Sequence, residues 1–169
     1  DVLLTKVLTS KVEKQIIVVD DFSNDGTREK LTNIYSDKVQ KLILHETNQG
    51  KGAAIQSAQK YIEGDYVIIQ DADLEYDPNQ YELFIKEIKE TKCKAVYGSR
   101  VLKKNKFKNV QNFSHKTRIW GNIFLTFVSN IINDQNLTDA HTCYKMIKSD
   151  IFKSINLEEK DFAFCPELN

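Results

Sequence analysis

Short apolar runs of strand length alternate along this chain with longer segments of helical period. The runs that read as strands are Gln15–Asp20, Lys41–His45, Tyr66–Gln70, Ala95–Gly98 and Thr142–Ile147. The first and third are almost continuous Ile and Val, which is typical of strands buried on both faces. Alternation of this kind predicts an α/β fold with a mostly parallel central sheet and helices on both faces. In such sheets, ligands bind beyond the carboxyl ends of the strands.

The length of 169 residues suits one domain. Residues 2–8 already have the pattern of a helix, and an α/β sheet normally places a strand before such a helix. We therefore expect residues 1–169 to be the central part of a single larger domain, with its first strand and its carboxyl-terminal portion outside this sequence.

Charge and cysteine content exclude two classes of protein. The 24 basic and 24 acidic side chains cancel, which removes the electrostatic argument for nucleic-acid binding. The three cysteines are widely spaced, form no C-x-x-C pair and do not combine with histidine at zinc spacing. They are interpreted as free thiols in a reducing compartment.

Acidic or basic residues follow three of the expected strands. Asp20 and Asp21 end the first run, Asp71, Asp73 and Glu75 follow the third, and Arg100 follows the fourth. Alternate side chains of an extended segment share a face, so Asp71, Asp73 and Glu75 are expected to point the same way. Three converging carboxylates indicate bound Mg²⁺ or Mn²⁺, with a diphosphate completing the coordination shell. A solvated acidic turn is the alternative interpretation.

Two loops have weaker signals. Asp20 and Asp21 are adjacent, so one is expected to reach a ligand while the other anchors the following loop, where Asp25-Gly26 favours a turn. The Asn48–Gly52 segment opens a helix but matches neither of the common glycine-rich phosphate motifs. A helix start with close packing is favoured there over a phosphate-binding loop.

Five motifs in this order resemble the family 2 glycosyltransferases of GT-A fold, most of all their polyprenyl-phosphate branch, which is similar to dolichol-phosphate mannosyltransferases. The motifs are Ile17-Val-Val-Asp-Asp-Phe-Ser-Asn-Asp-Gly-Thr27, Asn48-Gln-Gly-Lys-Gly-Ala-Ala54, Gln70-Asp-Ala-Asp-Leu-Glu-Tyr-Asp-Pro78, Tyr97-Gly-Ser-Arg100 and Leu137-Thr-Asp-Ala-His-Thr-Cys-Tyr-Lys145. The resemblance implies a catalytic domain with a Rossmann-like nucleotide-diphospho-sugar transferase fold. It also implies transfer of a hexose, with inversion, from a donor of the GDP-mannose or UDP-glucose type.

The resemblance also implies roles for individual residues. The nucleotide-sugar contacts it implies are Val19, Asp21, Asp71, Ala72 and Arg100. Asp73 and Glu75 are implied to hold the metal, so that Asp73 counts as catalytic. Many dolichol-type members have glutamine at the position of Glu75. The family's opening strand and its late basic residues have no counterpart in this sequence.

The acceptor decides whether a catalytic base is needed. A hydroxyl must lose a proton, whereas a lipid phosphate is already anionic near neutral pH. Asp139 is the matching candidate for a base or an acceptor-positioning group, with Glu167 in reserve, and each is alternatively a capping or ion-paired carboxylate. The favoured acceptor is polyprenyl phosphate, with a saccharide hydroxyl as the alternative.

Two segments favour a membrane surface as a partner. Four lysines lie within residues 103–108, and residues 119–132 form a helix with a broad apolar face that carries Trp120. The alternatives are a solvated loop and an ordinary core helix. These features predict a cytoplasmic protein, peripheral at or anchored to the inner face of the cytoplasmic membrane.

The strongest rival function is a phospho-acceptor signalling receiver. Such a domain also has two acids after its first strand, an aspartate after its third and a hydroxyl after its fourth, here Asp20, Asp21, Asp71 and Ser99. It leaves Asp73 and Glu75 unexplained. The glycosyltransferase interpretation is therefore preferred.

Overall fold

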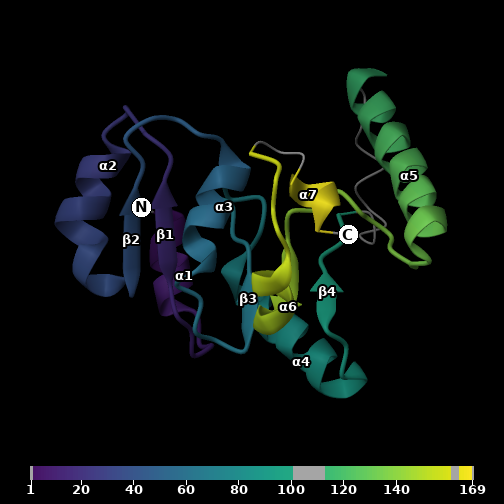
Figure 1. The fold of residues 1–169 in the computed structure, drawn as a ribbon, viewed down its shortest axis with the longest axis horizontal. Coiled ribbons are helices and arrows are strands. Elements are labelled where there is room, and N and C mark those ends of the chain that lie inside the picture. The colour runs from purple at the N-terminus through teal and green to yellow at the C-terminus, as the bar shows by residue number, and fades with distance from the viewer. Residues whose placement is uncertain (1, 101–112, 161–163, 169) are drawn as a thin grey trace.

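The computed structural model describes residues 2–100, 113–160 and 164–168, and it has the expected α/β architecture (Figure 1). The strands are β1 (Ile17–Asp20), β2 (Lys41–Leu44), β3 (Tyr66–Ile68), β4 (Ala95–Tyr97) and β5 (Lys145–Lys148). The helices of four residues or more are α1 (Val2–Thr9), α2 (Thr27–Lys30), α3 (Lys51–Gln59), α4 (Tyr81–Thr91), α5 (Phe113–Asn133), α6 (Ser149–Ser154) and α7 (Phe164–Glu167), together with the π-helical turn η1 (Leu31–Tyr35). Two 3₁₀ turns, η2 (Ser36–Lys38) and η3 (Pro78–Gln80), complete the elements.

The strands form two sheets in the described residues, rather than one mostly parallel sheet. β1 and β2 pair in parallel, with Ile17 opposite Lys41. The second sheet has the order β3-β5-β4, and β5 runs antiparallel to both neighbours. The apolar pattern predicted where strands lie but does not encode their direction, which is why β5 differs from the expectation.

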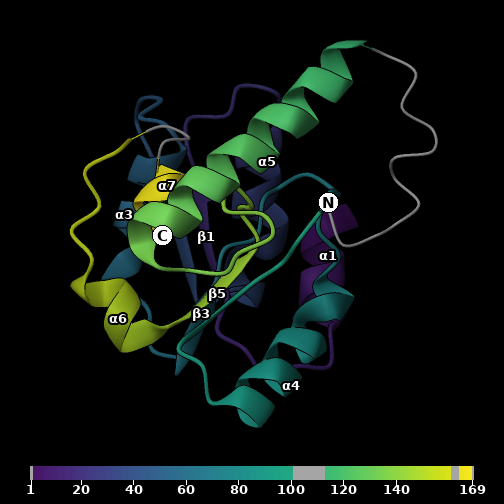
Figure 2. The same cartoon turned by 90° about the vertical axis from the view of Figure 1, so that its right-hand side faces the viewer.

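Helices cover both sides of the strands, as predicted. Figure 2 shows α3, α6 and α7 on one side and α1 and α4 on the other. The helical start predicted at Asp77-Pro78 is that of η3, which leads directly into α4: the Asp77 carboxylate accepts a hydrogen bond from the Asn79 N–H at 3.1 Å, and Pro78 is the first residue of η3.

Two hydrophobic clusters lie on opposite faces of β5. Met146 packs in one with the aromatic residues of α4, and Ile147 packs in the other with Phe152 of α6. Alternate residues of a strand point to opposite faces, so β5 holds the two clusters together. The periodic residues Tyr81, Phe84 and Ile88 are buried, as their spacing predicted.

A cavity of about 1,040 Å³ lies between the two sheets. β1 and β3 line it from either side, and the small side chains of α3 form part of its wall. Its apolar lining includes Ile17, Val19, Ala54, Ala58, Val67 and Ile69. Residues that follow the carboxyl ends of β1 and β3 line one end of this cavity, where the fold class predicts a ligand site.

Candidate functional site

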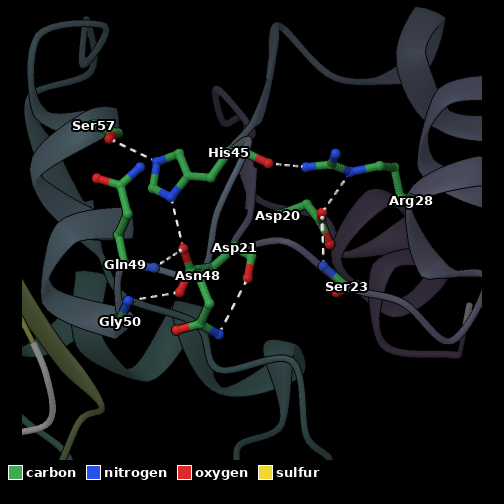
Figure 3. A network of polar contacts seen from close by, with 9 residues as sticks. All are labelled: Asp20, Asp21, Ser23, Arg28, His45, Asn48, Gln49, Gly50 and Ser57. Carbon is green, nitrogen blue, oxygen red and sulfur yellow. Dashed lines mark hydrogen bonds and ion pairs between the residues drawn. The ribbon is translucent and has the colours of Figure 1, made fainter.

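Asp20 is the last residue of β1, and its carboxylate holds the loop that follows. The Asp20 Oδ2 atom accepts hydrogen bonds from the Ser23 N–H at 3.2 Å and from Arg28 Nε at 3.1 Å (Figure 3). Arg28 also donates to the His45 carbonyl. Burial favours the neutral acid, but the bonds from Ser23 and Arg28 outweigh it and lower the pKa of Asp20. Asp20 is therefore the residue that anchors its own loop.

Asp21 joins β1 to the loop before α3. Its Oδ1 lies 2.7 Å from His45 Nδ1 and accepts from the Gln49 N–H at 2.9 Å, while Oδ2 accepts from the Gly50 N–H at 2.7 Å (Figure 3). His45 Nε2 in turn lies 2.9 Å from Ser57 Oγ on α3. Although burial opposes it, these bonds lower the pKa of the Asp21 carboxyl. We call the nine residues of Figure 3 the Asp20–Asp21 network.

The glycines before and within α3 have structural roles. Gly50 adopts a φ of 91°, which side chains rarely tolerate, at the position that starts the helix. A Cβ on Gly52 would lie 1.9 Å from the Glu159 carbonyl oxygen. The interpretation of this motif as a helix start with close packing is confirmed. The Asp25-Gly26 turn is confirmed too, since the Thr27 N–H donates to Asp25 at 3.1 Å.

Lys51 brings the start of α3 to the end of β3. Its ammonium forms an ion pair with the Asp71 carboxylate, and its Nζ lies 5.4 Å from the centre of the Phe164 ring of α7. Burial alone would lower the pKa of Lys51, but the hydrogen bond to Asp71 and the charge of that residue raise it. The Lys51 ammonium therefore places a positive charge next to the Asp71 carboxylate beside the cavity.

The segment after β3 is bent rather than extended, so the expected alternation does not apply to it. The Asp73 carboxylate accepts a hydrogen bond from the Glu75 N–H at 2.9 Å, a turn that aspartate forms with its own backbone. Glu75 has 44% of its side chain exposed and lies 4.0 Å from Arg100. Among the described residues, no group of three His, Cys, Asp or Glu side chains is placed to hold a metal. The three carboxylates thus do not converge as the sequence predicted.

Arg100 and Asp139 form a bidentate ion pair across 39 positions of sequence. Arg100 Nε and Nη2 donate to the two carboxylate oxygens at 2.8 and 3.0 Å, and the Arg100 N–H adds a bond of 3.1 Å. Asn122 of α5 donates to the same carboxylate at 3.0 Å. The Asp139 side chain is 0% exposed, whereas that of Arg100 is 35% exposed. Asp139 therefore fixes the outward-facing guanidinium.

The pKa values of this pair move apart. Burial would raise the pKa of Asp139, but the hydrogen bonds from Arg100 and Asn122 lower it. The hydrogen bond to Asp139 raises the pKa of Arg100. Both groups are therefore ionised near neutral pH. The structure shows Asp139 as an ion-paired carboxylate, which was the alternative to a base or an acceptor-positioning group. Glu167 is likewise engaged, since its carboxylate accepts from the Glu158 N–H at 2.7 Å.

The structure brings five of the predicted residues to one cavity. Those that line it are Val19, Asp21, Asp71, Ala72 and Asp73. Arg100, Asp139 and Glu75 form a second group linked by charge. Sequence analysis assigned no role in the site to His45 or Asn122. His45 directly follows β2, so its place at a strand end was the available signal, whereas Asn122 lies inside an apolar helix pattern without any.

The predicted membrane-facing segments have different outcomes. The lysines at 103–108 lie outside the described residues. Large apolar side chains of α5 are exposed, with Trp120 at 72% and Phe124 at 64%, so this helix does not have the surroundings of a core helix. Figure 1 shows α5 standing at the edge of the molecule, away from the strands. Within the part of the chain that is described, no helix has the length and apolar character needed to cross a membrane.

Most of the chain matches a known protein family. Residues 3–155 match the family described as glycosyl transferase family 2. The chain belongs to this family. That span includes β1 to β5 and every predicted site residue except the reserve candidate Glu167.

Two of the curated relatives that the chain matches are named as dolichyl-phosphate beta-glucosyltransferases. The chain is 30% identical over 167 residues to a dolichyl-phosphate beta-glucosyltransferase, ALG5D, of Trichomonas vaginalis, covering 91% of this chain and 48% of the relative. A second such enzyme of that organism, ALG5A, is 35% identical over 91 residues, covering 51% of this chain and 28% of the relative. An uncharacterized protein of Methanocaldococcus jannaschii is 26% identical over 155 residues, covering 86% of this chain and 65% of the relative. The chain spans about half the length of the first of these relatives.

Proposed function

We propose that this chain carries the donor-binding part of a glycosyltransferase that moves a hexose from a nucleotide-diphosphate sugar to polyprenyl phosphate. The observation that carries the proposal is the set of carboxylates at the strand ends, Asp21, Asp71 and Asp73, which line one cavity, with Asp21 and Asp71 in contact with the start of α3. Membership of family 2 and the names of the curated relatives support the same reaction class.

The proposed metal is Mg²⁺ or Mn²⁺, held by Asp73 and Glu75. Both offer hard oxygen ligands, and Mg²⁺ in proteins commonly takes one or two carboxylates with substrate phosphates supplying further ligands. Two carboxylates therefore suffice chemically even though three do not converge. When bound, the metal would neutralise the charge that develops on the leaving diphosphate.

Arg100 is proposed to contribute a second, fixed positive charge. Its guanidinium is held by the buried Asp139 while 35% of its side chain stays exposed, so it is oriented before any ligand arrives. Preorganised charges of this kind stabilise a developing anion without reorganisation. We assign Asp139 to positioning Arg100, because both of its carboxylate oxygens are engaged by donors.

A lipid phosphate acceptor agrees with this assignment. A phosphate oxygen is anionic near neutral pH and attacks without losing a proton, so the reaction does not need Asp139 as a base. A saccharide hydroxyl would need a base, which makes the acceptor a test of the role of Asp139. The relatives' names favour glucose as the transferred hexose over mannose.

The exposed apolar face of α5 supports placement at a membrane surface. Trp120, Phe124 and Phe127 are exposed on this helix, and aromatic side chains of this kind anchor helices in the lipid interface. We propose that the protein works at the inner face of the cytoplasmic membrane, where a polyprenyl phosphate would be presented.

Calorimetric titration of the full-length protein tests the donor site. UDP-glucose and GDP-mannose would each be titrated with Mn²⁺ and then with EDTA. Metal-dependent binding of one donor is expected, and Asp73→Asn should abolish it, while Asp37→Asn, an exposed carboxylate of η2, should not. Absence of binding by either donor, together with phosphorylation of Asp71 by acetyl phosphate, would favour the receiver instead.

Transfer assays test the acceptor. Radiolabelled sugar should pass to polyprenyl phosphate and not to a free oligosaccharide. Arg100→Lys, which keeps the charge but loses the planar pair of donors, should reduce kcat by about tenfold or more, since one oriented donor contributes about 10²-fold in other enzymes. Transfer to an oligosaccharide alone would refute the lipid acceptor.

A further inference from the structure

Two of the three cysteines meet beside the candidate site. Cys143 lies just before β5 and Cys165 lies in α7, 22 positions further along the chain. Their sulfur atoms are 2.9 Å apart, and both thiols are free in the structure. A disulfide has an S–S distance of about 2.05 Å, so a movement of about 1 Å joins them.

The two thiols differ in access and in charge. Cys143 is half-buried, and its pKa is lowered to about 7 by the hydrogen bond with Cys165 and by the nearby Lys51 ammonium, against the opposing effects of burial and Asp71. Cys165 is only 4% exposed, and its pKa is raised by its bond to Cys143 and by burial. Cys143 is therefore placed to attack as a thiolate while Cys165 stays protonated behind it.

We propose that Cys143 and Cys165 form a redox modification site that takes small-molecule disulfides. The Cys143 thiolate attacks one sulfur of the disulfide, forming a mixed disulfide and releasing the other half as a thiolate, which takes up a proton. Cys165 then loses its proton and attacks the Cys143 sulfur, which forms the protein disulfide and expels the second half as a thiol. Two protein thiols and one disulfide thus become one protein disulfide and two small thiols.

The surroundings connect this chemistry to the start of α3. Phe164, the neighbour of Cys165, contacts the Lys51 ammonium, and Lys51 pairs with Asp71. A disulfide removes the negative sulfur beside Lys51 and ties α7 covalently to the segment before β5. The modification itself does not depend on the proposed transferase function, because it involves only the protein and a disulfide.

Mass spectrometry of the full-length protein tests the proposal. The reduced protein would be incubated with glutathione disulfide, quenched with acid, alkylated with N-ethylmaleimide and digested. We expect a cross-linked peptide pair joining Cys143 to Cys165, reversed by dithiothreitol, while Cys93 remains available for alkylation. A glutathione adduct that stays on Cys143 without forming the cross-link would overturn the proposal.

Three serine variants separate the steps. Cys165→Ser should accumulate the mixed disulfide at Cys143, Cys143→Ser should form neither product, and the matched control Cys93→Ser should behave like the parent. At pH 7, Cys143 should react faster than Cys93, because the lowered pKa of Cys143, about 7, makes a large fraction of it thiolate at this pH. Equal or faster reaction at Cys93 would contradict the assignment of Cys143 as the attacking thiol.

These readouts are independent of donor binding. If nucleotide sugars fail to bind and the cross-link still forms, the proposed function fails and the redox site stands. If a donor binds and no cross-link forms, the redox site alone is refuted.

Discussion

The chain has two regions that are held together in different ways. The first, residues 16–59, contains the parallel β1–β2 pair, and its described part buries few apolar side chains, namely Tyr35, Val39 and Ala53. The second, residues 62–168, contains the β3-β5-β4 sheet and both hydrophobic clusters. The first region adds the partly buried Ile17 and Ile55 to the edge of one cluster, and its loops are held by hydrogen bonds to two carboxylates, whereas the second region is held by apolar packing around β5.

This difference determines what each region contributes to a ligand site. The Asp20–Asp21 network shapes a loop by local bonds, so each of its contacts is individually modest. The second region fixes Arg100 through a partner that is 39 positions away and fully buried. Loss of a buried group is therefore expected to cost more than loss of a network contact, and the predictions below measure that difference.

The largest expected effect is in the packed region. Phe152 of α6 is 1% exposed within its cluster, so Phe152→Ala should lower the free energy of unfolding by about 3–5 kcal/mol, through lost burial and the cavity left behind. Chemical denaturation measures the change. Phe124→Ala on the exposed face of α5 is the matched control and should change stability by less than about 0.5 kcal/mol. Similar losses for the two variants would show that the cluster is not a packed core.

Removing the partner of the buried carboxylate is expected to cost somewhat less. Arg100→Ala leaves Asp139 uncompensated at 0% exposure and should lower the free energy of unfolding by about 3 kcal/mol, at the lower end of values for broken buried pairs. The exposed pair Lys86–Glu90 offers a control, since Lys86→Ala should cost at most about 0.5 kcal/mol. A loss for Arg100→Ala no larger than that control would mean that Asp139 is hydrated in solution.

The sequence predicted α4 and the 119–132 part of α5 in the second region, but neither α6 nor α7 and little of the tertiary pairing. The apolar spacing of α4 and the Asp77-Pro78 start of η3 were enough to predict this helical segment, because both are local signals. The direction of β5 and the contact between Arg100 and Asp139 join residues that are far apart in the sequence, and no local pattern carries that information.

The candidate site shows the same limit. The position of Asp21, Asp71 and Asp73 after strands predicted that they lie at the same edge of the fold, and all three line one cavity. The convergence of Asp71, Asp73 and Glu75 was inferred from an extended backbone, but Asp73 bonds to the Glu75 N–H and bends the segment instead. A short polar side chain can hydrogen-bond to the nearby backbone and so compete with the extended conformation, and the rule of alternating side chains does not include this local effect.

Within the first region, the larger of the two expected effects is at His45. His45→Ala removes the contacts with Asp21 and Ser57 together, and it should lower the free energy of unfolding by about 1–2 kcal/mol. Amide exchange at Gln49 and Gly50, measured by NMR, should accelerate, because their acceptor Asp21 loses its orientation. Ser57→Ala, which removes only the outer contact, should have the smaller effect, and the reverse order would contradict a chain of bonds centred on Asp21.

The smallest expected effect is the pH dependence of the same network. The pKa of Asp21 is lowered in the folded chain, so its ionised form stabilises the fold above the unfolded pKa of about 3.9, and this contribution is lost as the pH falls through the folded value. Asp21→Asn should therefore cost about 1 kcal/mol between pH 5 and 7, and the difference from the parent should shrink below about pH 4. Asp37→Asn, with an exposed carboxylate, should show no such trend. Asp139 is present in both the parent and Asp21→Asn, so its titration cancels when the two curves of unfolding free energy against pH are subtracted, and the difference reports on the first region. A stability difference that grows toward acid pH would show that the Asp21 carboxylate is not held by the bonds of Figure 3.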